Sequence, residues 1–561
     1  MGSLPGSCAG RAARLARASL LLALIGPATV CAQQPAPGRV LPAPIERARQ
    51  TPPPARAEPP ERRREGVAPI PPAQPGEVTF RLEGIALMGV SSDAPADLLQ
   101  EAAPLLYKQV GLSQLKVLAA NIARRYHDAG YLLAHAFVPV QTVRDGVVRI
   151  EVREGRFASC RFEGQPVSSD SPLQRYADKL CSIRPMRLET LERYLLLMND
   201  VPGVEARAII VPAAVEGADP DLLVQLRQHH GNASLAVSNR ETEALGTWRG
   251  EARGELYDAF GWDGRHWAYY RHTAHNGLNL LSLGQELPLG SEGTKWGLSA
   301  LGSRSAASLF DAQLALDSEL ATVDAGVSYP WILRRTHNLF VRGTFSALNS
   351  RTEFEGLPFI DDRIRSLRAG LTFDAVDRAR GTNVLDLEIS HGIDGLGATP
   401  TGSPDASRTG GRSDYTKLNL YVARLQSLRP RLALLAAVQG QYTDQPLLAP
   451  EQFALGGEQW LRAYDAAELL GDRGFGAKLE LRYGPVASGA ANLYAFYDYG
   501  RVYYNDSSLP SQSAASAGGG IRFTLRNRLG AYLEVAVPIG RDVASQGNRD
   551  PRVFGGIQFA F

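Results

Sequence analysis

Several features that mark common protein classes are scarce or missing in this chain of 561 residues. The formal net charge is only +2, so the sequence lacks the strongly basic character of a nucleic-acid-binding protein. It has 4 methionines against 56 glycines, a balance that favours turn-rich β structure over helical bundles. No segment reaches about 18 consecutive apolar residues, which argues against a transmembrane helix.

Motifs of common catalytic and metal sites are also absent. The sequence contains no H-E-x-x-H, no G-x-S-x-G and no phosphate-binding glycine motif. His272 and His275 are three residues apart, so in a strand they point to opposite faces and make a poor pair of metal ligands. We therefore expect no enzyme activity, no metal and no cofactor. A lipase with scattered serine and histidine residues is the enzymatic alternative.

The N-terminus predicts export. Three arginines precede a short apolar run over residues 19–30, and Val30-Cys31-Ala32 fits a cleavage site before Gln33. Residues 1–32 are therefore predicted to be a signal peptide. A membrane anchor is a weaker alternative because the run is too short to span a bilayer. Lipid attachment at Cys31 is weaker too, because Val30 is bulky.

Cysteine is scarce, with 4 residues in the chain. Cys8 and Cys31 leave with the signal peptide, so Cys160 and Cys181 remain in an oxidising compartment. Such a pair is predicted to form a disulfide rather than a metal site. Two unpaired buried thiols are the alternative.

The region between the signal peptide and residue 229 divides into three parts. Residues 33–76 are rich in proline and arginine and predict an extended linker, in which residues 45–50 favour one or two helical turns as a candidate plug helix. Residues 77–156 read as strand, helix, helix, strand, strand, with helices expected over 95–106 and 112–130. Residues 157–229 repeat that order, which predicts two copies of one small α+β unit.

The remaining residues, 230–561, show two-residue alternation in sixteen segments. In one of them Ile521 and Phe523 alternate with Arg522 and Thr524. Long and short connections also alternate, which is typical of a sixteen-stranded antiparallel outer-membrane barrel; a soluble β-propeller or sandwich is the alternative. The long connections are expected near 303–320, 348–363, 392–412 and 443–473, and the short ones near 330–338, 375–383, 426–430 and 484–490.

Three motifs, in order along the chain, resemble those of the outer-membrane transporters of two-partner secretion, the FhaC/ShlB-like family. "LLLMNDVPGVEAR" closes the second unit, "LGGEQWLRAY" lies in the long connection 443–473, and "AFYDYG" follows in a strand. The strand motif comprises Phe496, Asp498 and Gly500. The loop motif comprises Gly456, Gly457, Leu461, Arg462, Ala463 and Tyr464.

The loop motif departs from the family at two positions, where Leu461 and Ala463 replace the usual valine and glycine. Ala463 carries a Cβ and tolerates positive φ less well than glycine does.

The resemblance implies a fold, a location and a function. The two units would be periplasmic POTRA domains, and the barrel would lie in outer-membrane lipid after insertion by the barrel-assembly machinery. An unfolded exoprotein of the haemolysin or adhesin type would bind the POTRA domains and cross the barrel without ATP. A BamA-like insertase is the alternative, although insertases usually carry more periplasmic units; a passive porin would need neither the tandem modules nor the loop motif.

Alternation also predicts roles for single residues. Asp498 is in phase with Phe496 and Gly500, so it should face the lumen if its neighbours face lipid. Arg462 is then expected to pair with Asp498 and anchor the loop inside the barrel; exposure to solvent at the loop tip is the alternative. Phe559 and Phe561, on the last strand, resemble the signal read by the barrel-assembly machinery.

Overall fold

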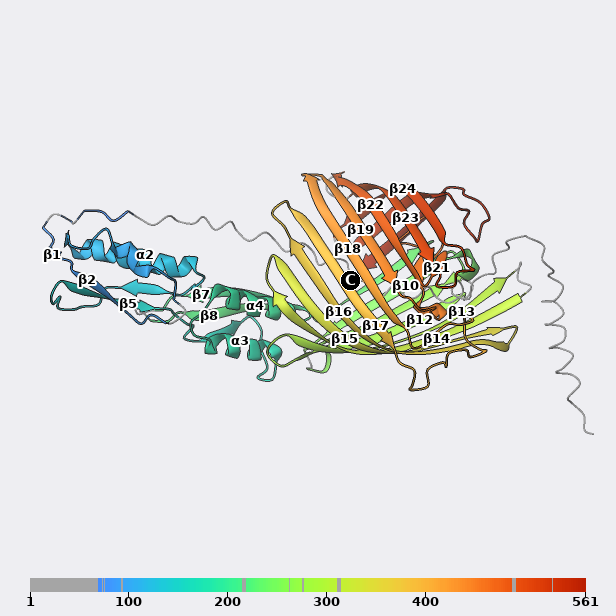
Figure 1. Cartoon of the computed structure of the whole chain (residues 1–561), viewed down its shortest axis with the longest axis horizontal. Coiled ribbons are helices and arrows are strands. Elements are labelled where there is room, and N and C mark those ends of the chain that lie inside the picture. Colours follow the sequence, from blue (N-terminus) through green and yellow to red (C-terminus); the bar gives the residue numbers. More distant parts are fainter. Residues whose placement is uncertain are drawn as a thin grey trace, which may run out of the picture. The chain divides into compact units, whose positions relative to one another are not determined.

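A computed structural model describes residues 69–561, apart from 73, 75, 92–93, 214–217, 262, 275–276, 310–313, 487–490 and 527. The predicted signal peptide, the candidate plug helix and most of the predicted linker lie outside these residues. Within the described part, Figure 1 shows two small units that combine helices and strands, followed along the chain by a β-barrel.

The first unit contains a three-stranded sheet of order β2-β5-β4. Strand β2 (Gly84–Met88) runs parallel to β5 (Val147–Arg153), and β4 (His135–Phe137) pairs with β5 antiparallel. A separate pair joins β1 (Phe80–Arg81) to β3 (Gln109–Val110). Helix α2 (Leu112–Asp128) buries one apolar face, which forms the core of the unit together with the inner face of β5.

Local chemistry fixes both ends of α2. Before the helix, the carboxylate of Glu77 accepts hydrogen bonds from the Ser113 hydroxyl at 2.6 Å and the Ser113 backbone N–H at 2.5 Å. These bonds hold the pKa of Glu77 below its usual value, and a negative charge favours a helix N-terminus. After the helix, Gly130 adopts a φ of +93°, which only glycine takes without strain.

The prediction of a helix over 95–106 is wrong. Only the 3-10 helix η2 (Leu98–Ala102) forms there. Pro95 and Pro104 flank it, and each proline lacks an amide donor and disfavours helical backbone in the residue before it. Apolar spacing alone could not outweigh these two residues.

The second unit has the same sheet topology, with order β6-β8-β7. Strand β6 (Cys160–Glu163) is parallel to β8 (Asp221–Gln228), and β7 (Val204–Val211) pairs with β8 antiparallel. Helices α3 (Pro172–Ser182) and α4 (Leu188–Asn199) pack on this sheet around a separate core.

The third part is a closed antiparallel barrel of sixteen strands, which confirms the predicted fold class. The first strand, β9, pairs with β10 on one side and with the last strand, β26, on the other. The strands are β9 (Gly231–Ser238), β10 (Arg249–Tyr257), β11 (Arg265–Thr273), β12 (Leu278–Leu289), β13 (Thr294–Leu309), β14 (Leu314–Leu333), β15 (His337–Phe354), β16 (Leu357–Val376), β17 (Gly381–Gly392), β18 (Thr416–Arg429), β19 (Leu432–Tyr442), β22 (Arg473–Val486), β23 (Ala491–Tyr503), β24 (Gln512–Leu525), β25 (Leu529–Ile539) and β26 (Arg552–Ala560). Short 3-10 helices η3 (Glu243–Leu245), η4 (Ala259–Gly261) and η6 (Ala449–Glu451) lie in the connections.

Two of the four expected long connections are wrong. Most of 303–320 belongs to β13 and β14, and residues 348–363 belong to β15 and β16 apart from the turn at Glu355 and Gly356. These segments are strands because their polar residues alternate with buried ones and pair across strands: Arg304 and Glu319 form an ion pair of 2.9 Å on an exposed face. The connections near 392–412 and 443–473 are long, as expected.

The barrel presents apolar side chains outward. On β23, Leu493 and Tyr497 are exposed, while Phe496 and Asp498 are buried. Because the barrel is closed, the backbone groups of each strand pair with those of its neighbours. Only every second side chain of a strand points to the outside of the barrel. Among the described residues, no helix has both the length and the apolar character needed to cross a membrane.

Candidate functional site

The connection between β19 and β22, residues 443–472, fills part of the barrel lumen. It contains a small antiparallel pair, β20 (Phe453–Leu455) with β21 (Leu469–Gly471). Its tip is buried: Leu461 and Ala463 are 0% exposed and Tyr464 is 1% exposed. The tip side chains share one apolar cluster with luminal residues of the wall, among them Phe496 and Phe554.

Arg462 forms the polar centre of this site. Its Nε and Nη2 donate to the two carboxylate oxygens of Asp498, at 3.0 and 2.9 Å. The Arg462 backbone N–H donates to the same carboxylate at 3.1 Å. Both side chains are buried, at 5% and 0% exposure, so this bidentate pair lies away from bulk solvent.

A second carboxylate, which sequence reasoning missed, completes the site. Glu480 on β22 accepts from Arg462 Nη1 at 2.5 Å and is itself buried. It also pairs with Arg482 at 2.7 Å and with Arg522 at 2.9 Å. In the sequence, Lys478, Glu480 and Arg482 alternate with apolar neighbours, which puts Glu480 on the polar face of its strand, but nothing local identifies its partner on the loop.

The wall beside Asp498 is shaped to receive the loop. The Arg462 guanidinium lies 3.6 Å from the ring centroid of Phe496, close enough for a cation–π contact. A Cβ at Gly500 would come within 2.4 Å of Leu455 Cδ1. The strand motif therefore gives the loop a carboxylate from Asp498, an aromatic face from Phe496, and room at Gly500 for the side chain of Leu455.

Backbone conformation within the loop differs from the expectation about Ala463. The residue in the left-handed region is Leu461, with φ of 53°, and Ala463 does not have a positive φ. Gly456 has φ of 121°, and a Cβ there would lie 2.1 Å from the Asp465 carbonyl oxygen. Glycine is therefore required at Gly456 both for its conformation and for its close approach to backbone.

Tyr464 extends the attachment to a third region of the wall. Its hydroxyl lies 3.2 Å from the carbonyl of Ile539 and 2.9 Å from that of Arg541, at the end of β25. Tyr464 thus packs in the apolar cluster inside the barrel and also donates from its hydroxyl to the backbone of the wall.

The base of the loop has two further ionic attachments that the sequence did not reveal. Glu451 is 4% exposed and pairs with Arg368 at 2.5 Å and Lys417 at 2.6 Å. Asp472, 0% exposed, accepts from Arg408 in the connection between β17 and β18. Each ion pair joins elements far apart in the sequence, so the alternation within a single strand cannot predict which residues pair.

The remaining predicted site residues lie elsewhere. Cys160 on β6 and Cys181 on α3 are joined by a disulfide, with their Cα atoms 6.1 Å apart. Phe559 and Phe561 are 41% and 67% exposed on the outer side of β26, with ring centroids 4.7 Å apart. Across the described ranges, no cluster of three or more His, Cys, Asp or Glu side chains could hold a metal ion.

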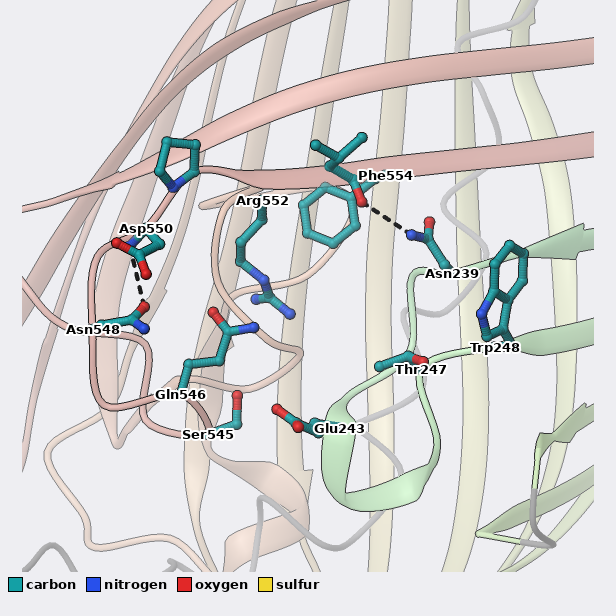
Figure 2. A pocket seen from close by; sticks show the side chains of 12 residues that line it. Asn239, Glu243, Thr247, Trp248, Ser545, Gln546, Asn548, Asp550, Arg552 and Phe554 are labelled. Carbon is teal, nitrogen blue, oxygen red and sulfur yellow. Dashed lines mark hydrogen bonds between the residues drawn. The ribbon is translucent and has the colours of Figure 1, made fainter.

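A pocket lies where the first and last strands of the barrel meet. Figure 2 shows Asn239, Thr247 and Trp248 on one side of it and Arg552 and Phe554 on the other. Asn239, Thr247 and Trp248 belong to the connection between β9 and β10, whereas Arg552 and Phe554 belong to β26.

Comparison with known proteins places the chain in a family. The profile of the haemolysin secretion/activation proteins ShlB/FhaC/HecB matches residues 222–523, more than half of the chain. The chain belongs to this family. The ShlB-type POTRA domain profile matches residues 80–155, and the second unit has the same sheet topology.

Individual relatives of this family member are distant in sequence. The heme/hemopexin transporter protein HuxB of Haemophilus influenzae (strain 86-028NP) is 23% identical over 448 residues, 78% of this chain and 79% of HuxB. The outer membrane transporter CdiB of Dickeya dadantii (strain 3937) is 22% identical over 440 residues, 76% of each chain.

Solved structures show the same fold. CdiB from Escherichia coli aligns with a TM-score of 0.71 at 18% identity, covering 89% of this chain and 94% of that structure. BamA from Haemophilus ducreyi, lacking POTRA domains 1–3, aligns with a lower TM-score of 0.51 at 14% identity, covering 86% of this chain and 100% of that one. The overall fold is therefore more similar to that CdiB than to this BamA.

Membership of the family gives the protein its location and general function. It is an outer-membrane transporter of two-partner secretion that translocates an exoprotein, with its POTRA domains in the periplasm. Strand β9 follows these domains and starts at the periplasmic side, so the connections β9–β10 and β25–β26 and the anchored loop belong to the extracellular side.

Proposed function

We propose that the protein captures an unfolded exoprotein of the haemolysin or adhesin type on its POTRA domains and passes it through the barrel without ATP and without catalysing a covalent reaction. The loop of residues 443–472 is held in the lumen by Arg462, and this attachment keeps the barrel in a conformation competent for transport. The observation that carries the proposal is the buried cluster of Arg462 with Asp498 and Glu480.

The energetics of this cluster favour a specific attachment over incidental contact. Burying a charge without a partner is costly, so a guanidinium with 5% side-chain exposure needs the two carboxylates beside it. The bidentate geometry fixes the orientation of the tip as well as its distance from β23. A loop that merely occupied space would need neither property.

Substrate capture is proposed to occur at the sheet edges of the POTRA domains. Strand β4 is one edge of the first sheet, and β7 is one edge of the second. An extended polypeptide can add to such an edge through backbone hydrogen bonds. The end of β7 exposes Ile209, Ile210 and Val211, at 42%, 38% and 39%, which would supply apolar contacts to an incoming chain.

The outer surface of the last strand is proposed to act in assembly. Val553 and Ile557 are 56% and 60% exposed and share the outward face with Phe559 and Phe561. This row meets outer-membrane lipid, and its terminal aromatic residues serve as the signal for the barrel-assembly machinery.

Secretion of the partner exoprotein tests the proposal. Deleting residues 77–156 should abolish binding of the exoprotein's N-terminal region and its secretion, while the barrel remains folded and heat-modifiable in the membrane. Arg462→Ala should leave exoprotein binding intact and impair secretion. Unchanged binding after the deletion, or full secretion by Arg462→Ala, would contradict the corresponding step.

A further inference from the structure

The closure between β9 and β26 is the shortest ladder beside the loop tip. Five residue pairs are in register, from Gly556 with Ser238 to Ala560 with Ser234. The ladders on either side, β9–β10 and β25–β26, each contain eight pairs. Fewer backbone hydrogen bonds join the first and last strands, so this seam depends more on side chains at its extracellular end.

Asn239 extends the seam beyond the last backbone pair. Its Nδ2 donates to the Val553 carbonyl at 3.0 Å, and its Oδ1 accepts from the Gly555 backbone N–H at 2.7 Å. Figure 2 shows the side chain of Asn239 directed at the strand that carries Phe554. The backbone N–H of Asn239 also donates to the Gly555 carbonyl at 3.2 Å, so the side-chain amide adds one donor and one acceptor to the single backbone bond at this end of the seam.

The next residue, Arg240, connects the β9 side of the seam to the loop tip. Its Nη1 donates to the Arg462 carbonyl at 2.8 Å, and its guanidinium also pairs with buried Glu534. The same group lies 3.8 Å from the ring centroid of Phe554 on β26. Arg240 is 8% exposed, so these contacts are shielded from solvent.

Arg552 makes the matching connection from the β26 side. Its Nη1 donates to the Ala463 carbonyl at 3.1 Å, and its Nη2 donates to Asp465 at 2.8 Å. Two successive carbonyls of the tip, those of Arg462 and Ala463, are therefore held by arginines from opposite sides of one seam.

We propose that Arg240 and Arg552 are positioning residues that fasten the loop tip across the β9–β26 seam, so that release of the tip and opening of the seam are coupled. The proposal rests on the proposed role of the anchored loop and adds what that loop controls. With the tip in place, each arginine has a buried acceptor and the first and last strands are held together. When the tip leaves, both arginines lose a buried acceptor at once, and the seam retains its five register pairs and Asn239.

Hydrogen exchange of the full-length protein in lipid nanodiscs tests the coupling. Arg552→Ala should speed amide exchange by about tenfold or more, both in the tip peptide covering residues 458–466 and in the seam peptides covering 233–240 and 553–561. Faster exchange at only one of the two places would overturn the proposal. Arg342→Ala is the matched control, because Arg342 also pairs with a carboxylate, Asp386 at 2.8 Å, but on β15. It should leave tip and seam unchanged.

A second variant works in the opposite direction and does not depend on a destabilising change. Ala236 and Gln558 face each other across the seam. Hydrogen-bonded and non-hydrogen-bonded pairs alternate along an antiparallel ladder, and Asn239 with Gly555 is a hydrogen-bonded pair, so Ala236 with Gln558, three pairs further on, is a non-hydrogen-bonded one. Cysteines at both positions should form a disulfide that holds the seam closed. Coupling is reciprocal, so oxidation should slow exchange in the tip peptide severalfold relative to the reduced protein; unchanged tip exchange would overturn the proposal.

Measuring secretion in the same variants separates this proposal from the proposed function. If tip and seam change together while secretion stays normal, the coupling holds and the role of the anchored loop in transport fails. If Arg462→Ala abolishes secretion and accelerates exchange in the tip alone, the role in transport holds and the coupling fails.

Discussion

Removal of Arg462 should release the loop tip from the barrel wall, and the effect can be measured by thiol labelling. Ala463 is 0% exposed and lies next to Arg462, so Ala463→Cys places a reporter thiol that reacts with an external maleimide only when the tip opens. The two native cysteines of the second unit form a disulfide and do not compete. The labelling rate then follows the equilibrium between the held and released tip.

The size of the effect follows from the partners that remain. Arg462→Ala leaves Asp498, 0% exposed, without its guanidinium, with Ser516 as the remaining side-chain donor at 3.3 Å. Removing one partner of a buried ion pair costs roughly 3–5 kcal/mol. At about 1.4 kcal/mol per tenfold, labelling should accelerate by about 100-fold or more. Glu480 contributes less to this loss because it keeps Arg482 and Arg522.

The partner variant and the double variant provide the decisive comparison. Asp498→Ala should accelerate labelling less than Arg462→Ala, because Glu480 still holds the arginine. The double variant should be no faster than Arg462→Ala alone, since both changes break one contact. Rates that multiply in the double variant would refute a shared contact. Arg304→Ala, in an exposed ion pair with Glu319, is the control and should change labelling by less than about threefold.

Three further predictions concern other parts of the chain. Replacing Cys160 and Cys181 by serine should lower the stability of the second unit by about 3 kcal/mol, seen as faster amide exchange in β6 and β8; mass spectrometry of the native protein showing two free thiols would contradict the disulfide. Removing Phe561 should reduce the amount of folded, heat-modifiable barrel, and unaltered levels would place the assembly signal elsewhere. Gly456→Ala should release the loop and impair secretion, because its Cβ meets backbone at 2.1 Å; Gly397→Ala carries similar backbone strain, with φ of +77°, but has open space around it and should impair secretion far less.

Two-residue alternation by itself determined the barrel and the direction of its side chains. Sixteen segments were countable because lipid on one side and a polar lumen on the other impose opposite chemistry on successive residues. The same rule placed Asp498 with Phe496 and Gly500 on the inner face, where the structure has them. Resemblance to family motifs added the loop and its arginine, which alternation could not have singled out.

Sequence patterns failed where a second constraint acted. The long connection predicted near 303–320 is wrong, because β13 and β14 continue there and carry exposed charged pairs such as Arg304 with Glu319. Apolar spacing over 95–106 predicted a helix that two prolines prevent.

Only the tertiary structure decided which charges meet. The partners of Arg462 are Asp498 and Glu480 on separate strands, and its carbonyl is held by Arg240, 222 residues earlier in the chain. A period of two tells which face a side chain occupies and nothing about which residue stands opposite it. That depends on how the strands are staggered when the sheet closes and on how far the loop folds back inside. Closure also brings β9 next to β26. The seam therefore forms only in the folded barrel, and only there do Arg240 and Arg552 lie on either side of it.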